Sequence, residues 1–428
     1  MTTTVGAKRP AVEVADVIRQ YGEAFMAKYG AALSPAQRQA LRALAACRTA
    51  ALGGHVERCL DCGHERIAYN SCRNRHCPKC QALARARWLE REAKLLLPVP
   101  YYHVVFTLPN ELAELASANR ALLYNALFQA TSATLRDVAA NRKRLGAQLG
   151  ILLVLHTWGQ NLHHHPHVHG VVTGGGLSCN QRGVLDTAPA WRSCRPGFFL
   201  PVRVLSRVFR GKYLELLRAA FDQGKIVFPG RLTALAERTR FVAWLRPLYA
   251  KDWVVYAKRP FGGPAQVLKY LARYTHRVAI SNQRLLALAD GQVTFRYKDY
   301  ADQQRADQQR AKTMTLSAEE FLRRFVQHVL PKGFVKIRHY GLLASRQRAA
   351  KLTLSRRLLW PLNAAAMLTM LEGAAPSTPG EAAPIDPARI DPAKLPHCPH
   401  CGGQRFIRSA LPREETEGMR TSAWDDTS

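Results

Sequence analysis

The sequence predicts an α+β fold in which a body of strands and helices follows a small cysteine-rich segment. Short runs of aromatic and β-branched residues, which favour strands, are mixed with longer segments of helical pattern. Six of the ten cysteines lie within residues 47–80, and this clustering sets the segment apart. With 428 residues, of which 47% are hydrophobic, the chain is long enough for two or three domains with a sizeable core.

Helices are expected at the N-terminal end, over residues 11–46. Ser34 and Pro35 provide an N-cap followed by a proline at the first helical position. After the cysteines, residues 88–97 are expected to form a short connecting helix, which two following prolines would end.

The body is expected to combine strands with long helical segments. Runs rich in aromatic and β-branched residues predict strands over residues 101–108, 151–158, 167–173 and 253–257. Helical patterns cover residues 110–147, 202–248 and 265–274. These strands and helices would form the larger part of the fold.

A hairpin and a capped helix are expected to complete the body. Asp290-Gly291 separates two strand-like runs and is a strong signal for a β-hairpin. Ser317 and Glu320 form a capping box that opens a helix running to Val329.

Two later segments carry little regular pattern. Residues 301–305 are repeated at once as 306–310, which indicates a small duplication in a loop. Residues 373–396 are rich in alanine, proline and glycine and are interpreted as a linker.

The charge balance points to a polyphosphate partner such as nucleic acid. The chain has 62 Lys+Arg against 31 Asp+Glu, a formal net charge of +31. No apolar run approaches the roughly 20 residues that span a bilayer. The polar N-terminus has no targeting signal, so a cytoplasmic protein without membrane contact is expected.

Two Cys-x-x-Cys pairs predict a metal site. Cys59 and Cys62 form the first pair, and Cys77 and Cys80 form the second pair, with 14 residues between the two pairs. Each pair supplies two thiolates from a tight turn, and two such turns close a tetrahedral Zn²⁺ site. We therefore predict one structural zinc held by these four residues, with free buried thiols as the alternative.

Several neighbours of these pairs are further candidates. Cys72, His64 and His76 could replace a ligand or support one. Three basic residues around the second pair are predicted to contact DNA phosphates, namely Arg73, Arg75 and Lys79. The pair formed by Cys398 and Cys401 is a weaker candidate for a separate zinc.

A histidine pair predicts a second kind of metal site. His167 and His169 are two residues apart in an expected strand, so their rings point to the same face and can bind one divalent ion. His156 could supply a third ligand if its strand forms a hairpin with this one, and Gln160 is the competing choice. The alternative is a histidine-rich surface loop.

A tyrosine pair follows in an expected helix. Tyr270 and Tyr274 are four residues apart and therefore lie on one helical face. A tyrosine can attack a phosphodiester and become linked to one DNA end. A parallel basic stripe is predicted to contact the DNA and consists of Lys269, Arg273 and Arg277. Packing is the alternative role for tyrosines at this spacing.

Several of these motifs resemble those of a known family in the same order. They lie at residues 70–80, 106–109, 155–158, 165–170 and 270–277. Over residues 40–345 the chain resembles the rolling-circle insertion-sequence transposases with two catalytic tyrosines, the IS91-like family.

The resemblance implies a small zinc-binding domain followed by an HUH nuclease domain. That domain has a central antiparallel sheet with the histidine pair on a middle strand and the tyrosines on a facing helix. The resemblance further implies Mg²⁺ or Mn²⁺ at His167 and His169, attack by Tyr270 and Tyr274, and a covalent 5′-phosphotyrosine link. The substrate would be single-stranded DNA at transposon ends and target.

Four segments follow from these observations. They are an N-terminal helical segment (1–46), a zinc-binding domain (47–97), an HUH nuclease domain (98–345), and a C-terminal helix, linker and Cys-x-x-Cys tail (346–428).

Two other functions remain open at this point. A plasmid rolling-circle replication initiator or a relaxase would share the HUH chemistry. A zinc-dependent DNA-binding regulator without catalysis would share the charge and the cysteines. Nicking of single-stranded DNA, and its specificity for element ends, would separate these functions.

Overall fold

The computed structural model describes residues 10–258, 266–267, 270–271, 278–298, 312–360 and 397–413. Several predictions fall outside these residues. They concern Lys269, Arg273, Tyr274, Arg277, the repeat at 301–310 and the linker at 373–396.

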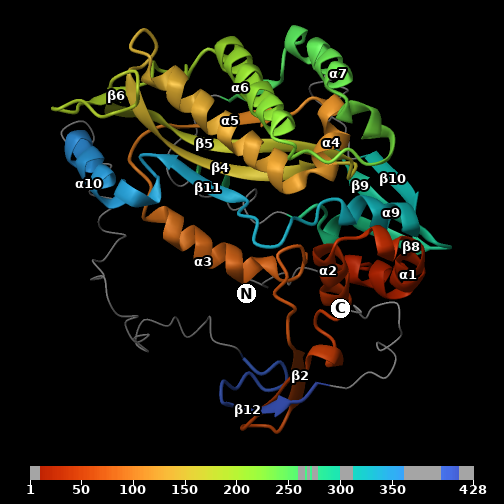
Figure 1. Ribbon diagram of the computed structural model, residues 1–428. Coiled ribbons are helices and arrows are strands. Elements are labelled where there is room, and N and C mark those ends of the chain that lie inside the picture. Colours follow the sequence, from red (N-terminus) through yellow and green to blue (C-terminus); the bar gives the residue numbers. More distant parts are fainter. Residues whose placement is uncertain are drawn as a thin grey trace.

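A central antiparallel sheet organises the body (Figure 1). Its strands lie in the order β11-β4-β5-β3-β7, with β6 paired to β5. Every pairing in it is antiparallel. The strands are β3 (Tyr101–Thr107), β4 (Ala147–Trp158), β5 (His164–Ser178), β6 (Trp191–Ser193), β7 (Val255–Ala257) and β11 (Ile337–Gly341). The predicted α+β fold with a central antiparallel sheet is confirmed.

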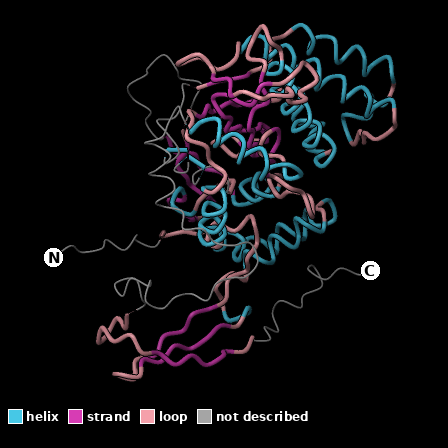
Figure 2. The backbone as a smooth tube through the Cα atoms, turned by 90° about the vertical axis from the view of Figure 1, so that its left-hand side faces the viewer, coloured by secondary structure: helices cyan, strands magenta, loops and turns pink. Residues whose placement is uncertain are grey.

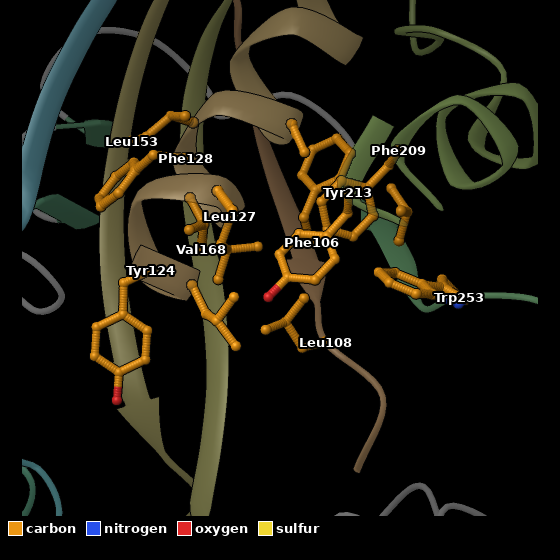
Figure 3. Packing of buried hydrophobic residues seen from close by; sticks show 14 of the residues in the cluster. Phe106, Leu108, Tyr124, Leu127, Phe128, Leu153, Val168, Phe209, Tyr213 and Trp253 are labelled. Carbon is orange, nitrogen blue, oxygen red and sulfur yellow. The ribbon is translucent and has the colours of Figure 1, made fainter. Parts of the chain in front are cut away.

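One face of this sheet is covered by a layer of helices. They are α4 (Ala113–Ala118), α5 (Arg120–Ala140), α6 (Val202–Asp222) and α7 (Arg238–Ala250). Phe106 of β3 packs edge-to-face on Phe209 of α6, with ring centroids 5.1 Å apart. Trp253 also packs edge-to-face on Phe209 (Figure 3). Burial of these large side chains fixes which residues of each strand face this layer.

The opposite face of the sheet carries a second layer. Helices α3 (Gln81–Ala93) and α10 (Arg348–Leu359) contribute Trp88 and Leu352 to its apolar cluster. The helical residues Val267 and Leu271 are buried in the same cluster. Because side chains alternate along a strand, Val154 of β4 and Val171 of β5 point to this layer. The second layer therefore covers the sheet face that bears the histidine pair.

Besides the two layers on the sheet, another packed group of elements joins the N-terminal helices to residues far along the chain, and we call it the third body. Its elements are α1 (Val14–Tyr29), α2 (Pro35–Ala45), β8 (Leu285–Ala289), β9 (Gln292–Tyr297), β10 (Lys312–Ser317) and α9 (Ala318–Val326). Phe25, Leu41, Phe295 and Phe321 share one apolar cluster. Packing thus crosses the predicted segment boundary after residue 46.

A three-stranded ribbon projects from the molecule (Figure 2). Its order is β12-β1-β2, with β1 (Gly54–Cys59), β2 (Glu65–Tyr69) and β12 (Phe406–Leu411). The C-terminal strand β12 pairs antiparallel with β1 over six residue pairs. The predicted tail therefore belongs structurally with the cysteine-rich segment.

Most predicted elements are present with shifted ends. The predicted strands at 101–108, 151–158, 167–173 and 253–257 correspond to β3, β4, β5 and β7, and the Asp290-Gly291 hairpin joins β8 to β9. The connecting helix expected over 88–97 is α3, which begins at Gln81 and ends at Ala93. Strand β11 was not predicted. Its residues become a strand only by pairing with β4 at the sheet edge.

Candidate active site and cysteine clusters

Three histidines meet on one face of the central sheet, and we call them the histidine centre. His167 and His169 lie on β5, and His156 lies on β4 directly opposite His167. Directly paired residues of antiparallel neighbours point to the same face. One ring nitrogen from each of the three histidines lies within 4.8 Å of the other two. The hairpin needed to bring His156 to the pair is therefore present.

A hydrogen bond fixes the tautomer of one ring of the histidine centre. His167 donates its Nδ1 proton to the carbonyl oxygen of His165, at 2.7 Å. In a neutral imidazole the other nitrogen, Nε2, then carries a lone pair. That Nε2 lies 3.1 Å from Nε2 of His169.

Tyr270 lies against the histidine centre. Its hydroxyl oxygen is 3.3 Å from Nδ1 of His169. The ring of His103 packs at 4.6 Å from the tyrosine ring, and its Nε2 lies 3.0 Å from Nδ1 of His169. Of the two predicted tyrosines, Tyr270 is placed beside the predicted histidines, and Tyr274 lies outside the described residues.

His103 is a site residue that the sequence reasoning missed. It lies on β3, where it alternates with Val104 and Phe106, whose side chains fill the core of the other face. This alternation in an expected strand was the available signal. Burial, together with the positive charge of Lys258 and the neighbouring His167, lowers the pKa of His103 from 6.5 to about 4, so the ring is neutral near pH 7.

Two further histidines, one at the start of β5 and one after α9, have structural roles. His164 donates its Nδ1 proton to the carbonyl of Ala113 at 3.0 Å and accepts at Nε2 from the hydroxyl of Tyr124 at 2.7 Å. His328 donates to the carbonyl of Leu162 at 3.0 Å and accepts from the hydroxyl of Thr157 at 3.2 Å. These bonds fix the loop that joins β4 to β5.

The cysteines form two clusters instead of the predicted one. The first cluster consists of Cys47, Cys72, Cys77 and Cys80, and the second of Cys59, Cys62, Cys398 and Cys401. The predicted grouping of Cys59 and Cys62 with Cys77 and Cys80 is wrong. The first pair lies at the tip of the β1–β2 hairpin, whereas the second lies beyond its base, where Asn70 bonds to Gly53. Five residue steps of strand β1 span about 17 Å, which is too far for shared ligands.

The first cluster is built into the third body. Cys47 and Cys77 are fully buried and pack in the same apolar cluster as Leu41 of α2. The Sγ atom of Cys47 is 3.3 Å from that of Cys80, and Cys72 lies 3.7 Å from Cys80. Cys72, considered above as a replacement ligand, belongs to this cluster.

The three basic residues around the second pair differ in their surroundings. Lys79 forms a largely buried ion pair with Glu13 at 2.7 Å, and Arg75 donates to the carbonyl of Phe334 at 2.7 Å. Arg73 is exposed. All three line a groove that also contains Arg48, Arg87 and Lys336. This groove is basic, and its lining includes no acidic residue among those described.

Comparison with known families gives two matches. A family model described as "Transposase zinc-binding domain" matches residues 17–108, and a model described as "Putative transposase" matches residues 150–351. The first match and the cysteine clusters support a structural zinc in the N-terminal region. No solved structure matches the chain. Among the described residues, no helix is long and apolar enough to span a membrane.

Two curated relatives extend these matches over most of the chain. The "Putative transposase y4qJ" of Sinorhizobium fredii is 56% identical over 351 residues, which are 82% of this chain and 85% of the relative. The "Transposase for insertion sequence element IS801" of Pseudomonas savastanoi pv. phaseolicola is 31% identical over 307 residues, which are 70% of this chain and 68% of the relative. The chain therefore belongs to the family of IS91-like transposases that carry an N-terminal zinc-binding domain.

Proposed function

We propose that this transposase nicks and rejoins single-stranded DNA at the ends of its element, with Tyr270 as an attacking group. The observation that carries the proposal is the position of the Tyr270 hydroxyl, 3.3 Å from the histidine centre. A tyrosine alone on a helix has many possible roles. A tyrosine beside three converging imidazoles has the neighbours of a phosphoryl-transfer nucleophile.

The histidine centre fits a divalent cation such as Mg²⁺ or Mn²⁺. Adjacent ligands of an octahedral ion at about 2.1 Å lie about 3.0 Å apart. The two Nε2 atoms of His167 and His169 are 3.1 Å apart, and His156 completes the group. Such an ion, when bound, polarises the phosphate oxygens and neutralises the charge that develops in the transition state.

In the proposed cleavage, the Tyr270 oxygen forms a bond to phosphorus and releases its proton. The bond between phosphorus and the 3′ oxygen of the preceding nucleotide breaks, and that oxygen takes up a proton. The product is a 5′-phosphotyrosine, in the direction that the family resemblance implies. Because the phosphotyrosyl bond conserves the energy of the broken bond, a free 3′ hydroxyl can reverse the step and join a new strand.

Tyr274 is the proposed second nucleophile. Its four-residue spacing from Tyr270 puts the two phenols one helical turn apart. One phenol would open the first strand and the other would accept the second. Lys269, Arg273 and Arg277 are proposed to hold the DNA backbone beside them, and Arg73, Arg75 and Lys79 to contribute through the basic groove.

A covalent-adduct assay tests this function. A labelled single-stranded oligonucleotide carrying an element end is incubated with the protein and Mg²⁺ or Mn²⁺, and the products are run on a denaturing protein gel. Tyr270→Phe and Tyr274→Phe should each retain an adduct but lose strand transfer, and the double variant should form none. Tyr249→Phe, on α7 across the sheet, is the matched control and should behave as the parent.

An adduct that persists in the double variant would overturn the proposed nucleophiles. The same assay separates the alternatives. An initiator or relaxase would cut a plasmid origin in preference to the element ends. A non-catalytic regulator would bind the oligonucleotide without cutting it. The similarity to the transposase for insertion sequence element IS801 favours the element ends.

A further inference from the structure

We propose that one zinc ion joins the two ends of the chain, held by Cys59 and Cys62 of the N-terminal domain and by Cys398 and Cys401 of the tail. The four Sγ atoms lie within 4.8 Å of one another. Cys59 is 3.6 Å from Cys401, and Cys62 is 3.7 Å from Cys398. The matched zinc-binding domain ends at residue 108 and supplies only half of this site.

The two halves of the site have the same local geometry. Each is a Cys-x-x-Cys-Gly turn in which the glycine N–H donates to the carbonyl of the first cysteine. Gly63 bonds to Cys59 at 2.9 Å, and Gly402 bonds to Cys398 at 2.8 Å. Both glycines have positive φ, 72° and 76°, which a side chain would disfavour. Two matching turns that present four thiolates to one point are the arrangement of a closed structural zinc site.

The tail is positioned for this role by specific contacts. The Leu60 N–H donates to the Arg405 carbonyl at 2.9 Å, next to the cysteines. Arg408 forms an ion pair at 2.6 Å with Glu57, whose side chain is only 5% exposed. Arg405 pairs with Asp61 in the turn between the two cysteines. These contacts align β12 on β1 and bring the thiolates of the tail pair to those of Cys59 and Cys62.

The ribbon needs a cross-link because it has almost no core. None of its described strand residues outside the cysteines belongs to one of the three apolar clusters of the molecule. Ile67 and Ile407 are each more than half exposed. A small three-stranded sheet without a hydrophobic face is marginal by itself, and disulfides or a structural metal commonly stabilise such folds. The cysteines are all free thiols, so a metal is the cross-link that fits.

The thiolate set also selects the metal. Four sulfur ligands favour Zn²⁺ over Mg²⁺ or Mn²⁺, which prefer oxygen and water. The site is closed by four protein ligands and leaves no position for substrate, so its role is structural. The zinc would close a loop between residues 62 and 398, which are 336 positions apart. The tail would then be an integral strand of the zinc-binding domain.

Metal analysis of the full chain tests the stoichiometry. The parent should contain about two zinc ions, one for each cluster of four thiolates. Cys398→Ser combined with Cys401→Ser should contain about one, because the first cluster is untouched. The control is Cys179→Ser combined with Cys194→Ser, which lie in neither cluster, and it should keep about two. A tail variant that keeps two zinc ions would overturn the proposal.

A cleavage experiment tests the cross-link without any ligand substitution. A protease site is inserted between residues 380 and 390 of the full chain, and the cut protein is run on a sizing column. With zinc present, the tail fragment should elute with the body, and a chelator should release it. Elution of the tail alone in the presence of zinc would refute the zinc cross-link. Release by a reductant, with no effect of the chelator, would show a disulfide instead.

Discussion

The histidine centre and the second cysteine cluster bring ligand side chains together in different ways. The histidine centre takes all three rings from two neighbouring strands, within residues 156 to 169. The second cysteine cluster joins residues up to 342 positions apart, and it does so on a ribbon without an apolar core. A substitution in the histidine centre should abolish activity and leave the fold intact, because two helical layers pack on the sheet. A substitution in the second cysteine cluster should disrupt the fold of the ribbon.

The largest expected effect is on chemistry at the histidine centre. We expect His169→Ala to lower the nicking rate by roughly 100-fold or more, because loss of a metal ligand removes transition-state stabilisation of several kcal/mol. DNA binding and thermal stability should change little. The measurement is the rate of adduct formation with saturating oligonucleotide. The control is His163→Ala, which changes an exposed histidine in the loop before β5 and should leave the nicking rate unchanged. Near-normal nicking by His169→Ala would disprove the assignment of the centre.

The second prediction compares the two cysteine clusters. We expect Cys77→Ser to lower the melting temperature by at least ~5 °C, because Cys77 is buried and its cluster packs with α1, α2 and β9. Cys62 is exposed on the ribbon, so Cys62→Ser should lower the melting temperature of the body by less than ~2 °C. Differential scanning calorimetry measures both. Equal effects of the two variants would mean that the ribbon and the body unfold as one unit.

The third prediction concerns His103, which lies beside His169 but on β3, outside the β4–β5 hairpin. We expect His103→Phe to lower the rate of adduct formation about tenfold, the usual effect of losing a partner that orients a ligand. The ring contact with Tyr270 would be kept, whereas the nitrogen facing His169 would be lost. The half-saturating Mn²⁺ concentration should rise as well. A lower rate with unchanged Mn²⁺ dependence would indicate that His103 only packs against Tyr270.

The smallest expected effect is a pH dependence of stability. Burial, with smaller contributions from His164, Arg120 and His76, lowers the pKa of His328 from 6.5 to about 3, although the hydrogen bond to the Leu162 carbonyl opposes this shift. The ring is neutral in the folded protein and titrates near pH 6.5 when unfolded. Unfolding therefore takes up protons below pH 6.5, so the stability from this group is complete above pH 6.5 and falls towards pH 3.

Denaturant titrations between pH 7 and pH 4 measure this dependence. His328→Gln can donate to Leu162 and accept from Thr157 without titrating, so its stability should fall less steeply with pH than that of the parent. An identical slope for the two proteins would show that other groups account for the acid sensitivity.

Strand pattern alone predicted the parts of the fold that depend on neighbours in sequence. Alternation within β5 placed His167 and His169 on one face, and the short loop to β4 made His156 a candidate ligand. The Asp290-Gly291 turn predicted the β8–β9 hairpin. In each case the controlling geometry is a local backbone period or a short connection, and the residues involved are no more than 13 positions apart.

The sequence by itself determined that the chain has a histidine pair, two phenols at helical spacing and three pairs of clustered cysteines. Only the tertiary structure decided which of these residues meet. Cys59 and Cys77 are separated because strand β1 carries one of them away from the base of its hairpin. Cys62 meets Cys398 because β12 returns to pair with β1. The spacing of the cysteines indicates which two thiolates can lie in one turn. Long-range strand pairing determines which two turns share an ion.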